Sequence, residues 1–156
     1  MRLFTCAAAA AAVLLAAGTA SAQDTSLAPT YGTSNLSAGF QPDPLNISVR
    51  SGGGLDATQT IAASCQGWVA RAPDYRVNYT AGSLPFYISA DSRADVTLIV
   101  NGPDGQWYCD DDTGEGLNPW VVFNKPRSGQ YDIWIGTYGQ NTVEDATLSI
   151  SELTHR

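Results

Sequence analysis

The stretch DVTLIVNGPDGQWYCDDDTGEGLNPWVVFNKPRSGQYDIWIGTY, residues 95–138, decides the fold class of this chain. It holds four runs rich in β-branched and aromatic residues, at 95–101, 106–110, 119–124 and 130–138. The runs are separated by NGPDG, DDDTGEG and KPRSG, which carry the Gly, Pro, Asn and Asp that turns favour. The segment therefore predicts an antiparallel meander with an acidic loop, from Asp110 to Glu115, at its centre.

Similar short runs lie on both sides of this stretch, at 46–50, 67–71, 74–80, 85–90 and 146–151. No window keeps a helical period over three turns, and only Leu55–Ala63 could hold a short helical turn. Evenly spaced strands with turn signals between them indicate an all-β fold, either a sandwich or a barrel.

Alternation in the run at 130–138 places Tyr131, Ile133 and Ile135 on one face and Trp134 on the other. Ile99 in the run at 95–101 also lies on the second face of its strand. We therefore expect the second face to lie under a crossing loop or to form an exposed aromatic patch.

The N-terminal segment is predicted to be a signal peptide, residues 1–22. Arg2 precedes an apolar run from Ala7 to Ala17, which is too short to span a bilayer, and small residues at 20–22 fit a cleavage site before Gln23. We expect residues 23–30 to form a flexible tail and residues 31–156 to form a single domain.

Cleavage would leave two of the three cysteines, Cys65 and Cys109. In an oxidising compartment an isolated pair is most simply a disulfide, and the competing interpretation is two separate buried thiols. Two cysteines and one histidine cannot build a Cys/His zinc site.

The chain carries 15 acidic and 8 basic residues, a net charge of −7. This charge disfavours binding to nucleic acid or to anionic lipid surfaces, and no second apolar segment suggests insertion into a membrane. The expected location is therefore secreted or periplasmic.

The acidic loop is the strongest candidate for chemistry. It places four carboxylates within six residues, and Ca²⁺ prefers oxygen ligands on a flexible backbone. Alternation along an extended chain predicts that Asp110 and Asp112 share an ion while Asp111 faces solvent or an amide. Glu115, at the end of the loop, is a further candidate ligand. The alternative is a solvated acidic turn that protects a sheet edge.

The chain resembles the bacterial pre-peptidase C-terminal domain, a β-sandwich of jelly-roll type. The similarity lies in Ala94–Gly105, in Asp110–Asn118 and in Ser128–Gly136. It implies an antiparallel β-sandwich of jelly-roll type in which Asp95 and Asn118 lie close enough to the acidic loop to join a calcium site. Members of this family usually follow a catalytic domain, whereas here the domain is the whole expected mature chain.

A catalytic role is not predicted. The only histidine, His155, follows the last expected strand, and a serine hydrolase needs a histidine within hydrogen-bond reach of its serine. Three adjacent aspartates on a turn are also a poor arrangement for a glycosidase acid and base. A serine-peptidase role therefore rests only on association with protease-linked relatives.

Aromatic residues suggest a second class of function, a carbohydrate- or peptide-binding module. We name Trp134, Trp120 and Trp107 as candidates for stacking on a ligand, with burial in the core as the alternative for each. The sequence thus predicts a non-catalytic accessory or binding domain, stabilised by calcium, whose partner is a polysaccharide, a peptide or another secreted protein.

Overall fold

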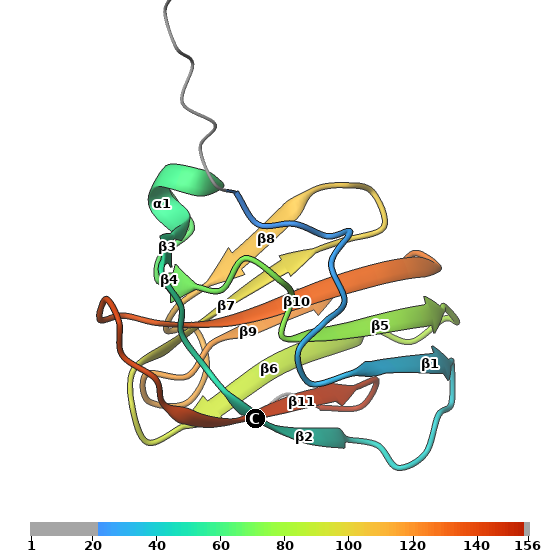
Figure 1. The fold of residues 1–156 in the computed structure, drawn as a ribbon. Coiled ribbons are helices and arrows are strands. Elements are labelled where there is room, and N and C mark those ends of the chain that lie inside the picture. Colours follow the sequence, from blue (N-terminus) through green and yellow to red (C-terminus); the bar gives the residue numbers. More distant parts are fainter. Residues whose placement is uncertain (1–21, 155–156) are drawn as a thin grey trace, which may run out of the picture.

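The structure, a computed structural model, describes residues 22–154. The predicted signal peptide, apart from Ala22, lies outside these residues, as does His155. Figure 1 shows two β-sheets that pack face to face, which confirms the predicted all-β sandwich. Within residues 22–154, no helix is long and apolar enough to cross a membrane.

The larger sheet, sheet A, has seven strands, and the smaller one, sheet B, has four. Sheet A consists of β1 (Thr33–Ser37), β3 (Leu55–Asp56), β4 (Trp68–Val69), β5 (Tyr75–Thr80), β7 (Val96–Asn101), β8 (Trp107–Asp110) and β10 (Gly129–Thr137). Sheet B consists of β2 (Leu45–Arg50), β6 (Phe86–Ser92), β9 (Trp120–Phe123) and β11 (Asp145–Ser151). The long strand β10 forms the centre of sheet A, between β5 and β4 on one side and β7 on the other.

The chain crosses repeatedly from one sheet to the other, as in the predicted jelly-roll type of sandwich. It passes from β6 in sheet B to the β7–β8 hairpin in sheet A, then to β9 in sheet B and back to β10. The predicted meander over 95–138 is therefore wrong, because the acidic loop joins two sheets instead of neighbouring strands. Turn residues mark where a strand ends, but they do not say which sheet receives the next strand.

The central core lies between the sheets and follows the predicted alternation. Tyr131, Ile133 and Ile135 of β10 are fully buried in it, and they face Phe86 and Ile88 of β6. The ring of Phe86 also stacks on that of Tyr79, with centroids 4.2 Å apart. Burying large apolar side chains in this layer supplies the main driving force for the sandwich.

A second, smaller group of apolar residues lies on the outer face of sheet A, and we call it the side cluster. It consists of Ala57, Cys65, Val69, Ile99 and Trp134. The segment that covers it contains a short helix, α1 (Ala57–Thr60), within the predicted helical stretch. Of the two expectations for this face, the crossing segment is the one confirmed.

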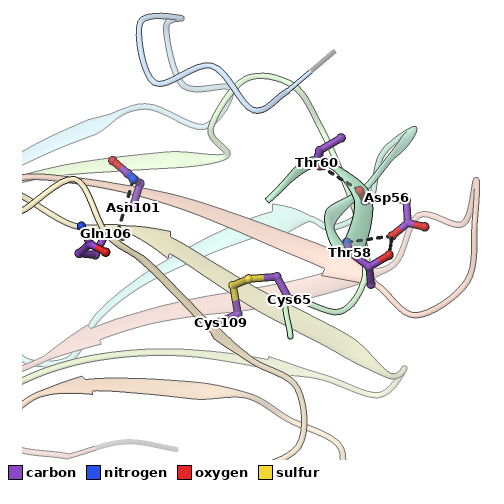
Figure 2. The surroundings of a disulfide bond; sticks show 7 residues. All are labelled: Asp56, Thr58, Thr60, Cys65, Asn101, Gln106 and Cys109. Carbon is purple, nitrogen blue, oxygen red and sulfur yellow. Dashed lines mark hydrogen bonds between the residues drawn. A yellow bond between two sulfur atoms is a disulfide. The ribbon is translucent and has the colours of Figure 1, made fainter. Parts of the chain in front are cut away.

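A disulfide fastens the covering segment to β8. Cys65 and Cys109 are bonded, with Cα atoms 5.2 Å apart and a sequence separation of 44, which confirms the predicted pair. Figure 2 shows Cys65 in the chain after α1, joined to Cys109 on the strand beneath it. In the helix itself, Asp56 caps the first turn, because its carboxylate accepts a hydrogen bond from the Thr58 N–H at 2.9 Å.

Two strands differ from the sequence prediction. The sequence does not predict β1, because Thr33–Ser37 contains a single apolar residue, Leu36. It does not predict β3 either, because that strand is only two residues long. β1 pairs with β5 in parallel, whereas all other strand pairs of the described chain are antiparallel.

Residues 23–30, expected to form a flexible tail, lie along the outer face of sheet A. The guanidinium of Arg76 donates hydrogen bonds to the carbonyl oxygens of Thr25 at 2.6 Å and Leu27 at 3.2 Å. Backbone N–H groups of Asp24 and Thr30 donate to the carbonyls of Arg71 and Pro73. The polar composition suggested a tail, but these tertiary hydrogen bonds hold the segment in place.

Candidate metal centre

The acidic loop begins where β8 ends and crosses to β9. Asp95 comes from a second crossing, the turn between β6 and β7. Both crossings lie at the same end of the sandwich, since β7 and β8 pair with Leu98 opposite Asp110. The fold thus brings Asp95 close to the loop, as the family resemblance implied.

Three carboxylates meet at this end of the molecule. Asp95, Asp111 and Asp112 each offer an oxygen, and these oxygens all lie within 4.8 Å of one another. Asp112 is exposed, whereas Asp95 and Asp111 are partly buried. We call these three residues the carboxylate cluster.

Two oxygens of the cluster are buried and have no hydrogen-bond partner in the described structure. They are Oδ1 of Asp95 and Oδ1 of Asp111. A buried polar atom without a partner costs roughly 1–3 kcal/mol, and more when it carries charge. The fold therefore presents two acceptor atoms that a cation would satisfy.

The electrostatics of the cluster agree with this geometry. Burial raises the pKa of Asp95, and the charge of Asp112 raises it further. Burial also raises the pKa of Asp111, and the charges of Asp112, Asp95 and Asp110 add to that effect. Without a cation, ionising these groups is unfavourable because the carboxylates repel one another.

Asp110, predicted as a ligand, has a different role in the structure. Its Oδ2 accepts hydrogen bonds from the hydroxyl of Thr113 at 2.7 Å and from the N–H of Trp120 at 2.8 Å. A weaker bond comes from the Thr113 N–H at 3.3 Å. Asp110 thus stabilises the loop through hydrogen bonds to Thr113 and Trp120, and it is not part of the carboxylate cluster.

The other two predicted ligands also lie outside the cluster. The side-chain oxygen of Asn118 accepts a hydrogen bond from the N–H of Ser92 at 2.9 Å. Glu115 is exposed near the tip of the loop. Beneath it, the N–H of Gly114 donates to the carbonyl of Asn118 at 2.8 Å, and a Cβ on Gly114 would meet that same oxygen at 2.3 Å.

Asp111 is the cluster residue that the sequence prediction placed elsewhere. Ile99 pairs with Cys109, so continuing that register would place Asp111 opposite Thr97, on the face of sheet A that carries Asp95. A signal for the position of Asp111 was present in the sequence at Cys109. The disulfide to Cys65 fixes the face of sheet A on which Cys109 lies, and Asp111, two residues later, shares that face while the chain stays extended.

The geometry of the cluster suits a calcium ion. Ca²⁺ binds oxygens at about 2.3–2.6 Å, so two oxygens on one ion lie no more than about 5 Å apart. The separations in the cluster meet this limit. The ion takes six to eight oxygens in general, so water and loop carbonyls would complete its coordination.

The three tryptophans named as stacking candidates differ in their access to solvent. Trp134 is fully buried in the side cluster, and Trp107 packs against it with ring centroids 5.2 Å apart. Trp120 is half-buried on β9, where its indole N–H donates to the carbonyl of Thr113 at 2.9 Å. Its ring lies 6.0 Å from that of Tyr87 on the outer face of sheet B.

Comparison with models of protein families gives no match, and comparison with curated proteins gives none either. Among solved structures, the chain is similar to PliG of Aeromonas hydrophila, described as a periplasmic lysozyme inhibitor of g-type lysozyme. The two share 11% sequence identity, and the match covers 76% of this chain and 96% of the other with a TM-score of 0.41. This degree of likeness carries no argument about the function of the chain.

Proposed function

We propose that this chain is a secreted or periplasmic, non-catalytic β-sandwich domain with an accessory or binding role, and that its carboxylate cluster binds Ca²⁺. The observation that carries the proposal is the cluster itself, with two buried carboxylate oxygens that lack partners. The disulfide and the predicted signal peptide support export, since disulfides persist in oxidising compartments.

A bound ion would join two crossings between the sheets. Asp95 precedes β7, whereas Asp111 and Asp112 follow β8, so one cation would tie the β6–β7 turn to the acidic loop. It would also offset the mutual repulsion that raises the pKa of Asp95 and Asp111. Calcium here serves stability and loop order, with no part in a reaction.

Calorimetric titration of the purified protein with Ca²⁺ tests the site. We expect a saturable binding heat that disappears in Asp111→Asn and Asp112→Asn. Asp91→Asn is the matched control, because Asp91 is an exposed carboxylate on β6 outside the cluster, and its removal makes the net charge less negative by the same amount. Absence of any binding heat in the unmodified protein would reject the calcium site and leave a solvated acidic turn.

A second candidate function is binding of a carbohydrate or peptide, favoured by the pair Tyr87 and Trp120. Their rings are inclined by 30°, and alternation along β6 and β9 directs both to the outer face of sheet B. Aromatic rings bind the apolar faces of sugars and peptide side chains. Retention on insoluble polysaccharide that is lost in Trp120→Ala, with unchanged melting temperature, would support this role.

A further inference from the structure

Gln23 combines a predicted position in the chain with an unusual environment in the structure. The small residues at 20–22 predict cleavage before it, which would make Gln23 the first residue of the mature protein. The residue is only 9% exposed, although glutamine is mostly found at the surface.

The side-chain amide of Gln23 has no hydrogen-bond partner in the described structure. Both Oε1 and Nε2 are buried and unpaired. A buried amide that lacks partners is unfavourable, because it has given up water without receiving a replacement.

The residues that follow hold Gln23 in place. The N–H of Asp24 donates to the carbonyl of Arg71 at 2.9 Å, and the guanidinium of Arg71 lies 3.2 Å from the Asp24 carboxylate. Figure 1 shows the described chain starting at the end of the molecule that carries α1. Gln23 therefore cannot move far from the protein without breaking these contacts.

Cleavage before Gln23 would add a positive charge to this position. The new α-ammonium would lie on Gln23, which is buried, next to Asp24, whose backbone N–H is hydrogen-bonded to Arg71. A charged group that is shielded from water is unfavourable unless it has an oppositely charged or hydrogen-bonding partner.

We propose that Gln23 is a modification site, at which the mature N-terminus closes to pyroglutamate. The deprotonated α-amine attacks the side-chain Cδ, a C–N bond forms to give a five-membered lactam, and the bond from Cδ to Nε2 breaks. Nε2 leaves as ammonia with the proton from the amine, so no oxidant or other reactant is needed. The reaction removes the charge and one unpaired nitrogen together.

The test uses the full chain, expressed with its signal segment in an exporting bacterial host and purified from the exported fraction. We expect an intact mass that is one ammonia below that of the chain starting at Gln23. N-terminal sequencing should be blocked, and treatment with pyroglutamyl aminopeptidase should unblock it to read Asp24 first.

The matched control is Gln23→Asn, which keeps a side-chain amide but is one carbon too short for a five-membered lactam. This variant should show a free N-terminus that sequences directly. A free Gln23 amine in the unmodified protein, or a mature terminus at another residue, would overturn the proposal. Either result would leave the calcium proposal unaffected, because the carboxylate cluster does not involve the terminus.

Discussion

Asp74 and Asp132 are both nearly inaccessible to solvent, but only Asp132 has a cationic partner. Arg76 donates to the Asp132 carboxylate at 2.6 Å, and the Asp132 side chain is only 2% exposed. Asp74 instead accepts a single hydrogen bond of 2.7 Å from the N–H of Ile135. Burial raises the pKa of Asp74 to about 7, against an ordinary value of 3.8. A buried carboxylate without a cationic partner thus has an unfavourable charged form, whereas a neighbouring cation favours that form.

Asp74 should make the stability of the protein depend on pH. The folded protein binds the Asp74 proton more tightly than the unfolded chain, so this contribution is fully present below 3.8 and is lost as the pH rises through about 7. Asp74→Asn keeps an acceptor for the Ile135 N–H and cannot ionise. We expect urea unfolding of this variant to show a weaker decline of stability between those two pH values.

A control separates the charge of Asp74 from its hydrogen bond. Asp74→Ala removes both, so relative to Asp74→Asn it should lose about 1–3 kcal/mol of stability at every pH, because the Ile135 N–H is left without its acceptor. If Asp74→Asn follows the same pH dependence as the unmodified protein, Asp74 does not titrate as described.

The sequence predicts the acidic loop, but the structure groups Asp111, and not Asp110, with Asp95 and Asp112. The run of acidic residues showed that an oxygen-rich loop exists. Whether Asp110 or Asp111 joins Asp95 depends on where β8 ends and the chain turns, because alternation holds only while the chain is extended. The polar contact of Asp110 with the Trp120 N–H spans ten residues, and no local pattern predicts it.

At the level of elements, nine predicted runs correspond to strands of the structure, from β2 and β4 through to β11. These runs were found because their apolar residues alternate and their ends carry turn residues. β1 was missed because its stability comes from pairing with β5 and not from its own composition. The partner of each strand in space depends on tertiary packing, which explains why the predicted meander failed.

The disulfide should stabilise the covering segment over Trp134. A bond that closes a loop of 44 residues restricts the unfolded chain, and the entropic model gives about 4 kcal/mol at that length. The double variant Cys65→Ser, Cys109→Ser should therefore melt several degrees lower than the oxidised protein.

A second measurement localises the effect of the disulfide. Reduction should loosen the segment around α1 first, so hydrogen exchange should rise there and in the side cluster before it rises in β10. Two alkylatable thiols in the native, unreduced protein would contradict the bond itself.

At the level of the whole molecule, Arg76 connects three parts of the structure. It bridges β5 to Asp132 on β10 and holds residues 23–30 through the carbonyls of Thr25 and Leu27. Arg76→Ala leaves the Asp132 carboxylate buried without its cation, which costs roughly 3–5 kcal/mol in comparable pairs. Limited proteolysis should then cut within residues 23–30, where the unmodified protein is protected.

Arg76→Lys is the matched control for that prediction. It keeps the positive charge but not the planar fork that reaches both the carboxylate and the carbonyls. We expect smaller destabilisation than for Arg76→Ala, with residues 23–30 still released. Equal protection of residues 23–30 in all three proteins would show that Arg76 does not anchor this segment.

The sandwich as a whole should be stabilised by calcium, because the folded state gathers the carboxylates that the unfolded chain disperses. Binding to the folded state alone adds RT ln(1 + [Ca²⁺]/Kd), about 2.7 kcal/mol at roughly a hundred times Kd. Mg²⁺ should substitute poorly, since it demands a tighter octahedral site and releases water reluctantly.

The most direct test is a pair of melting curves for the protein, one in millimolar Ca²⁺ and one in chelator. We predict a melting temperature several degrees higher with Ca²⁺, a difference that Asp111→Asn removes and Asp91→Asn retains. Superimposable curves for the unmodified protein would contradict the calcium site.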